Sequence, residues 1–258
     1  MSKLFITIIG FISIAVSFLI GETQTIELEY ANWNMISFYV LPENLDIQDI
    51  FQPVIDSGNL ISIYEGSQLD SLKQVDGEWV NTIGDIDPKW GYSVYVNQSV
   101  TLTIEGDPVE LPLAIILSGS DPAGMSTIGY PFNVAQPVTE VFEYINSLGV
   151  LILVANGNGQ YYMPNFNVNT VVDLEPGQGY RVSVFDSVLF HYCEPGTDCN
   201  CTLGDVNIDN EINVVDIIST VNCILNGTGD CSCADMNLDG RIDIIDIVLM
   251  VNTILGNE

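Results

Sequence analysis

Two acidic stretches near the C-terminus have the residue types and spacing of a metal-binding loop. In the stretch from Asp235 to Asp246, oxygen-bearing side chains occupy positions 1, 3, 5, 9 and 12, and position 6 is a glycine. Ca²⁺ is a hard cation that takes roughly six to eight oxygen ligands, and a short loop supplies them when alternate side chains converge with the position-7 carbonyl. The predicted ligands are Asp235, Asn237, Asp239, Arg241 (through its carbonyl), Asp243 and Asp246.

The same pattern begins thirty residues earlier. Its predicted ligands are Asp205, Asn207, Asp209, Glu211 (through its carbonyl), Asn213 and Asp216. Position 6 is Asn210, and asparagine tolerates a positive φ better than most residues. Both stretches resemble an EF-hand calcium loop with Asp in place of Glu at position 12. The tandem pattern predicts two bound calcium ions, and the alternative is a pair of acidic surface turns.

An apolar segment with helical spacing follows each loop. The first contains Val214, Ile217, Ile218, Val221, Ile224 and Leu225, and the second contains Ile244, Ile247, Val248, Val251, Ile254 and Leu255. Each loop is therefore predicted to open an amphipathic helix, and the two helices are expected to bury their apolar stripes against each other.

Two loop–helix units of this kind, without the leading helix of an EF-hand, resemble a type I dockerin. The sequence reads G-D-V-N-x-D-N-x-I-N-x-x-D-I and then D-M-N-x-D-G-x-I-D-x-x-D-I, within about residues 203–256. The resemblance implies a calcium-folded docking module that binds a cohesin-type receptor domain on a scaffold or cell surface.

The stretch departs from the dockerin pattern at the residues that contact the partner. The family's Ser-Thr type pair at loop positions 10 and 11 is replaced by Val214-Val215 and Ile244-Ile245, and its later basic pair by Asn222-Cys223 and Asn252-Thr253. The calcium chemistry carries over, whereas the partner surface is more apolar. Such a surface suits a hydrophobic partner or packing onto the chain's own neighbouring domain.

The six cysteines all lie in the last quarter of the chain: Cys193, Cys199, Cys201, Cys223, Cys231 and Cys233. An even number in an exported chain predicts disulfides. We expect Cys223 to pair with Cys231 or Cys233, and Cys193 with Cys199 or Cys201. A zinc site is the alternative, but C-x-C spacing is unlike a zinc knuckle and His191 is the only histidine.

The region before the cysteines is predicted to be rich in β-strands. Apolar residues alternate with polar ones in residues 24–30, 92–96 and 100–104. The last two segments are expected to form a hairpin around residues 97–99. Short helices are expected after the capping residues Asp46 and Thr139.

An internal repeat divides this β region. Residues 82–96 match residues 170–184 at an offset of 88, with the pattern D-[IL]-[DE]-P-x-x-G-Y-x-V-x-V. The Pro and Gly are expected to make a turn, and the Tyr to start a strand that faces a core. The second copy, through residues 156–167 and 174–180, resembles a repeat module of secreted bacterial proteins, and residues 33–37 and 91–92 mark a divergent first copy. That resemblance implies location but no chemistry.

The predicted fold is mainly β, with two tandem β-sandwich-like modules and a small C-terminal α domain of the dockerin type. The predicted parts are a signal peptide or hydrophobic anchor (1–21), two β modules (22–108 and 109–192), a Cys-rich linker (193–202) and the dockerin-like domain (203–258). Lys3 and the apolar run 4–20 predict a signal peptide, with an uncleaved anchor as the alternative. Either interpretation places the rest of the chain outside the cytoplasm, in the extracellular space or at the cell surface.

The charge balance excludes several partners. The chain has 34 acidic and five basic residues, with a net charge of −29. Nucleic acid and anionic membranes are excluded because no basic patch can form. Cations, neutral glycans and other proteins remain as possible partners.

Catalysis is not expected, because the single histidine lies in a predicted linker. A glycosidase-type carboxylate pair is the alternative, but no pair stands out.

These observations predict a secreted, non-enzymatic calcium-binding protein that mediates docking or adhesion. One alternative is a structural subunit of a calcium-dependent filament or surface assembly, formed with copies of itself. Another is carbohydrate binding through exposed aromatic rings, although core packing is the simpler role for Trp33, Trp79, Trp90, Tyr92, Tyr161 and Tyr162. Candidate N-glycosylation sites are Asn97, Asn200 and Asn226.

Overall fold

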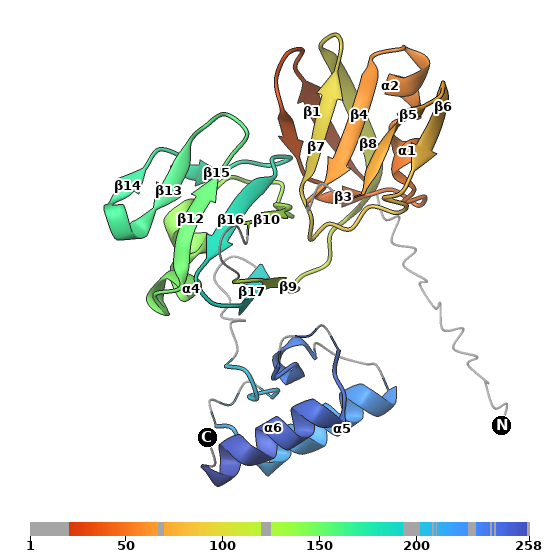
Figure 1. Cartoon of the computed structure of the whole chain (residues 1–258). Coiled ribbons are helices and arrows are strands. Elements are labelled where there is room, and N and C mark those ends of the chain that lie inside the picture. The colour runs from red at the N-terminus through yellow and green to blue at the C-terminus, as the bar shows by residue number, and fades with distance from the viewer. Residues whose placement is uncertain are drawn as a thin grey trace, which may run out of the picture.

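The computed structural model describes residues 21–66, 70–119, 125–192, 202–207, 209, 211–226, 231–237, 239 and 241–256. The fold is mainly β, with several sheets, a few short helices and a C-terminal pair of longer helices (Figure 1). The apolar run at residues 4–20, predicted as a signal or anchor, lies outside the described residues. Within the described ranges, every helix is too short or too polar to cross a membrane.

The first β unit encloses one core with two sheets. Their strand orders are β2-β7-β4-β5-β6 and β1-β8-β3. The elements are β1 (Glu22–Leu28), β2 (Asn34–Ile36), β3 (Val40–Leu41), α1 (Ile47–Ile50), α2 (Gln52–Asp56), β4 (Leu60–Glu65), β5 (Ser71–Val75), β6 (Glu78–Asn81), β7 (Tyr92–Val96) and β8 (Val100–Pro108). Both sheets and both helices contribute to one apolar cluster, which includes Leu28, Phe51, Val94 and Leu102.

The second β unit repeats this arrangement around its own core. Its elements are β9 (Leu113–Leu117), β10 (Met125–Ile128), β11 (Gln136–Pro137), α3 (Val138–Val141), α4 (Glu143–Ser147), β12 (Leu151–Ala155), β13 (Tyr161–Met163), η1 (Pro164–Phe166), β14 (Val168–Asn169), β15 (Asp173–Leu174), β16 (Tyr180–Val184) and β17 (Val188–Tyr192). The main sheet has the order β10-β16-β12-β13-β14, and β9 pairs with β17 and β11 with β15. In chain order, its strands correspond one to one with those of the five-stranded sheet in the first unit.

The predicted hairpin of residues 92–104 is wrong. β7 and β8 exist, but they belong to different sheets. The connection between them is bonded to the segment before β4: Asn97 donates through its side-chain amide to the carbonyl of Gly58 at 2.8 Å. Alternation could not reveal this crossing, because the apolar sides of both strands face the same core.

Three smaller expectations have different outcomes. Asp46 caps α1 as predicted, and its carboxylate accepts hydrogen bonds from the N–H groups of Gln48 and Asp49. The second helix does not begin after Thr139: α3 begins at Val138, with Pro137 at the N-cap and no side-chain cap bond. His191 is not a linker residue but lies buried in β17.

The tyrosine of the repeated motif starts a strand in both units and is fully buried. The hydroxyl oxygen of Tyr92 accepts a hydrogen bond from the N–H of Asp87 at 2.8 Å, and that of Tyr180 accepts one from Glu175 at 2.7 Å. Burial raises the pKa of Tyr180 to about 12, so its hydroxyl stays neutral at physiological pH. Each tyrosine therefore anchors the motif's acidic segment to the core.

The glycine of the repeated motif joins the two units. Gly91 donates its N–H to the carbonyl of Thr127, and Gly179 donates to the carbonyl of Met35, both at 3.0 Å. Thr127 and Met35 occupy equivalent positions of β10 and β2. A Cβ on Gly179 would lie 2.8 Å from the carbonyl oxygen of Ile36 and 3.3 Å from Cα of Gly91. The motif glycine is thus required for close approach of the two copies, which extends its predicted role in a turn.

Candidate functional site

The first acidic loop is organised by Asp216, which is fully buried in the first turn of α5 (Val214–Asn226). One of its carboxylate oxygens accepts hydrogen bonds from the N–H groups of Val206 at 2.9 Å and Asn207 at 3.2 Å. The other accepts from the N–H of Asn213 at 2.9 Å. A single side chain therefore ties the entry and the exit of the loop to the helix that follows.

The second loop contains the same arrangement around Asp246, in the first turn of α6 (Ile244–Leu255). Its carboxylate accepts hydrogen bonds from the N–H groups of Met236 at 2.9 Å, Asn237 at 3.4 Å and Asp243 at 2.8 Å. A short η2 turn (Ser232–Ala234) leads into this loop. The sequence repeat of 30 residues is thus also a repeat of backbone geometry.

Side chains at positions 1, 3 and 5 lie together in both loops. The N–H of Asp209 bonds to Oδ1 of Asp205 at 3.0 Å and to Oδ1 of Asn207 at 3.1 Å. The N–H of Asp239 makes the same two bonds, at 3.2 Å to Asp235 and 3.0 Å to Asn237. The structure therefore brings the first three predicted ligands of each loop to one side of the turn.

The residues at loop positions 7 and 9 also have structural roles that were not predicted from the sequence. The backbone N–H of Glu211 bonds to Asp209, and that of Arg241 bonds to Asp239, both at 2.9 Å, while both side chains are exposed. At position 9, Asp243 caps α6 by accepting a hydrogen bond from the N–H of Ile245 at 2.7 Å. Asn213 makes the equivalent bond to the N–H of Val215, at 2.8 Å. An Asn or Asp directly before an apolar helix is the sequence signal for such a cap.

The donor set suits calcium. Four carboxylates of the two loops are buried: Asp205, Asp216, Asp235 and Asp246. Arg241 is the one Lys or Arg in the sequence after position 181, and its side chain is exposed. Buried carboxylates require hydrogen-bond donors or a cation, and carboxylate and amide oxygens are the ligands that hard cations prefer. No three Asp, Glu, His or Cys side chains gather into a metal cluster within the described ranges.

A disulfide braces the two loop–helix units. Cys223, in the C-terminal half of α5, is bonded to Cys231 at the entry of the second loop, which is one of the two pairings expected for it. Cys233 is buried and is also disulfide-bonded. The expected pairing of Cys193 with Cys199 or Cys201 lies outside the described residues. A sulfur in a disulfide is not a zinc thiolate, which removes Cys223, Cys231 and Cys233 from the zinc alternative.

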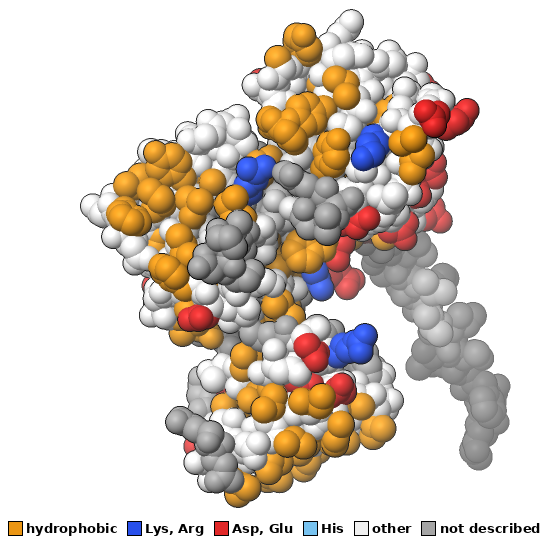
Figure 2. Space-filling model, in the orientation of Figure 1, with side chains coloured by type: hydrophobic (Ala, Val, Ile, Leu, Met, Phe, Trp, Pro, Cys, Tyr) orange, Lys and Arg blue, Asp and Glu red, His pale blue; other side chains and the backbone are white. Residues whose placement is uncertain are grey.

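The apolar stripes of the two helices are largely exposed, contrary to the expectation that they bury each other. The exposed side chains are Val214, Val215, Ile218, Ile224 and Leu225 of α5, and Ile244, Ile245, Val248, Ile254 and Leu255 of α6. The helices meet through other positions, and Thr220 Oγ1 lies 3.7 Å from Met250 Sδ. Figure 2 shows the resulting row of hydrophobic side chains over the C-terminal unit. The buried side of each helix carries Asp216 or Asp246, which bonds to its loop. Much of each apolar stripe is therefore exposed to solvent.

The contact with the second β unit does not cover this row. It is a small apolar cluster of Leu189 and Cys233, with Ala114, Ile116 and Leu203 around them. These residues lie in β9, β17 and the segments before the two loops. The exposed faces of α5 and α6 therefore remain accessible next to the β units.

The predicted aromatic and glycosylation residues are scattered. Tyr92 and Tyr162 are buried, and Trp79 and Trp90 are partly buried against the cores. Trp33 and Tyr161 are exposed. These six aromatics therefore do not form one exposed row. Asn97 and Asn226 are exposed, whereas Asn200 lies outside the described residues.

Comparison with known families decides the nature of the C-terminal unit. Residues 203–255 match the dockerin type I domain. The C-terminal unit is a dockerin. The matched range contains both acidic loops and both helices, and type I dockerins bind calcium, so the match supports calcium as the cation that this unit binds. The dockerin accounts for about a fifth of the chain, and the searches of curated proteins and of solved structures gave no match.

Proposed function

We propose that this chain is an exported, non-enzymatic, calcium-binding protein that docks to a protein partner outside the cell through its dockerin. The observation that carries the proposal is the equivalent exposed apolar face on each of the two dockerin helices. Dockerin domains bind cohesin-type partners, and they occur in extracellular and cell-surface proteins. The apolar run at residues 4–20 supports export. The two β units, as tandem sandwich-like modules, are the cargo that docking places at the partner.

Two calcium ions hold the dockerin in its docking conformation, one in each loop. Asp205, Asn207, Asp209 and Asp216 supply side-chain oxygens in the first loop, with Asp235, Asn237, Asp239 and Asp246 in the second. Glu211 and Arg241 contribute carbonyl oxygens, and Asn213 and Asp243 contribute at position 9. Each ion offsets the repulsion between carboxylates that the fold brings together, so ion binding and folding of this unit are coupled.

The partner surface is apolar. In the exposed row, Val214-Val215 and Ile244-Ile245 replace the hydroxyl pairs of familiar dockerins. An exposed apolar patch of this kind marks an interaction site, and burying it releases free energy in proportion to the area removed from water. Binding is therefore expected to depend on calcium through folding and to change little with ionic strength, because apolar contacts are not screened by salt.

A charge placed in each apolar face tests the docking surface. Because the two helices present equivalent residues, a change in one face alone leaves the other intact, so the variant carries both Ile218→Asp and Val248→Asp. Binding to immobilised type I cohesin domains in millimolar Ca²⁺ is expected to weaken by roughly 2–4 kcal/mol, since each aspartate becomes an unpaired charge in an apolar interface. Surface plasmon resonance at low and high salt measures the change.

The matched control is Val75→Asp, which places the same charge on an exposed valine of β5 in the first β unit. Its binding is expected to equal that of the unchanged chain. Equal binding by the double variant would contradict the proposed surface. A chain that ignores every cohesin but forms calcium-dependent oligomers in light scattering would support the structural-subunit alternative instead.

A further inference from the structure

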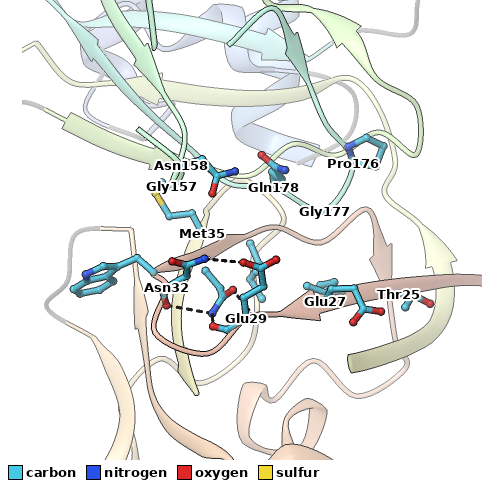
Figure 3. Close-up of a pocket in the computed structure, with 14 residues that line it drawn as sticks. Thr25, Glu27, Glu29, Asn32, Met35, Gly157, Asn158, Pro176, Gly177 and Gln178 are labelled. Carbon is cyan, nitrogen blue, oxygen red and sulfur yellow. Dashed lines mark hydrogen bonds between the residues drawn. The ribbon is translucent and has the colours of Figure 1, made fainter. Parts of the chain in front are cut away.

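A polar groove lies between the two β units, beside the edge strand β1 (Figure 3). It encloses about 260 Å³. One wall belongs to the first unit and carries Thr25, Glu27, Glu29 and Asn32, whereas the other belongs to the second unit and carries Asn158 and Gln178. In Figure 3 the amide side chains of Asn158 and Gln178 lie across the gap from Asn32 and Glu29.

The two walls are fixed relative to each other by close backbone contacts. A Cβ on Gly157 would lie 2.9 Å from the carbonyl oxygen of Trp33, so the turn of the second unit rests directly on the first. Ser37 donates its hydroxyl to the carbonyl of Gln178 at 2.8 Å and its N–H to the carbonyl of Gly177 at 3.0 Å. The groove is therefore a preformed feature of the paired units, as expected of a binding site.

The polar side chains of the first wall are held in place. Along β1, Thr25 and Glu27 are exposed while Ile26 and Leu28 point into the core. The carboxylate of Glu27 accepts a hydrogen bond from the hydroxyl of Thr101 at 2.8 Å, and that of Glu29 accepts one from the side-chain amide of Asn32 at 2.7 Å. A carboxylate has further acceptor sites beyond these bonds, and they are available to a ligand in the groove.

Trp33 connects this polar groove to an apolar hollow. Trp33 is 47% exposed and is a lining residue of both spaces. The hollow, of about 430 Å³, is lined by Trp33, Ile61, Ser62, Tyr64 and Tyr95. The ring of Trp33 packs edge-on against Tyr95 with centroids 3.9 Å apart, which holds the indole in place at the junction.

We propose that this groove binds a neutral oligosaccharide. Planar carboxylate and amide groups can bond to neighbouring sugar hydroxyls, and the flat C–H face of a pyranose ring with equatorial substituents stacks on an indole ring. The groove offers both features side by side. Glu27 and Glu29 repel acidic sugars, since the lining residues that the structure describes include no Lys or Arg. A metal ion fits less well, because among the described lining residues the charged ligands are two carboxylates two residues apart, Glu27 and Glu29.

Affinity electrophoresis of the full chain in native gels tests this site. The probes are hydroxyethylcellulose and galactomannan as neutral β-linked polysaccharides, and alginate as an acidic one. At least one neutral probe is expected to retard the chain, and alginate is not. Trp33→Ala is expected to raise the dissociation constant on the order of tenfold, since an exposed aromatic anchor is removed. Asn158→Ala, which keeps the backbone bond of its turn, is expected to weaken binding in the same direction.

Phe166→Ala is the matched control, because Phe166 is 71% exposed in η1 and does not line the groove. Its retardation is expected to equal that of the unchanged chain, as is that of the dockerin double variant Ile218→Asp/Val248→Asp. The proposal is overturned if neither neutral probe retards the chain. It is equally overturned if Trp33→Ala and Asn158→Ala migrate as the unchanged chain does, or if alginate is bound as well as the neutral probes.

Discussion

Replacing Asp246 with alanine is expected to unfold α6 while both β units stay folded. The substitution leaves the N–H groups of Met236, Asn237 and Asp243 without their acceptor and removes a buried carboxylate that we propose as a calcium ligand. Hydrogen bonds to a charged group contribute about 1.5–3 kcal/mol each, and metal-binding free energy in such a unit is folding free energy. The combined loss, at least about 4 kcal/mol, is comparable to the whole stability of a small domain.

Hydrogen–deuterium exchange of the full chain in millimolar Ca²⁺ measures this effect segment by segment. Peptides from α6 are expected to lose protection, and peptides from β7 and β16 are expected to keep it. Thr253→Ala is the control, since Thr253 is exposed on the same helix and its hydroxyl bonds only to the carbonyl of Leu249. Native protection of α6 in the Asp246→Ala chain would show that this carboxylate does not hold the second loop.

Replacing Gly179 with alanine is expected to destabilise the joined β units by about 2–3 kcal/mol. The new Cβ would lie 2.8 Å from the carbonyl oxygen of Ile36 and 3.3 Å from Cα of Gly91, and both contacts are with backbone. Backbone atoms of a paired strand cannot yield without disturbing their own hydrogen bonds, so the cost falls in the upper range of overpacking. Differential scanning calorimetry of the full chain is expected to show a melting temperature lower by several degrees.

Gly149→Ala separates the steric effect from backbone strain. Gly149 has φ +73° but no atom within 4 Å of its Cβ position, so alanine there costs only about 1 kcal/mol through the left-handed backbone. Gly91→Ala, at the equivalent place in the first unit, is expected to match Gly179→Ala. If Gly179→Ala and Gly149→Ala lower the melting temperature equally, the close approach of the two units is not what requires the glycine.

The sequence predicted the parts of the molecule that depend on local spacing. Oxygen-bearing side chains at alternate positions, from Asp235 to Asp246, predict a turn whatever surrounds it, and the thirty-residue repeat doubles the signal. The start of a buried strand at Tyr92 and at Tyr180 followed from the repeated motif in the same way. Asp46 caps α1 because a helix N-cap is determined by a few neighbouring residues.

Features that depend on contacts between distant segments were not predictable. Helical spacing shows that α5 and α6 each have an apolar face, but it does not show what covers that face, and Ile218 and Val248 are exposed. Tyr30 continues the alternation of β1 but lies beyond its end and is 61% exposed. The close contact of Gly91 with Gly179 also could not be predicted, because it joins positions 88 residues apart in the chain.

Calcium titration of the metal-free full chain tests the central claim most directly. Isothermal titration calorimetry, with exchange protection of α5 and α6 followed in parallel, is expected to give two ions per chain and a gain of protection in both helices on binding. The Asp246→Ala chain is expected to keep a single site. Absence of calcium binding in the millimolar range, or full protection of both helices in the presence of chelator, would contradict the calcium-folded docking unit.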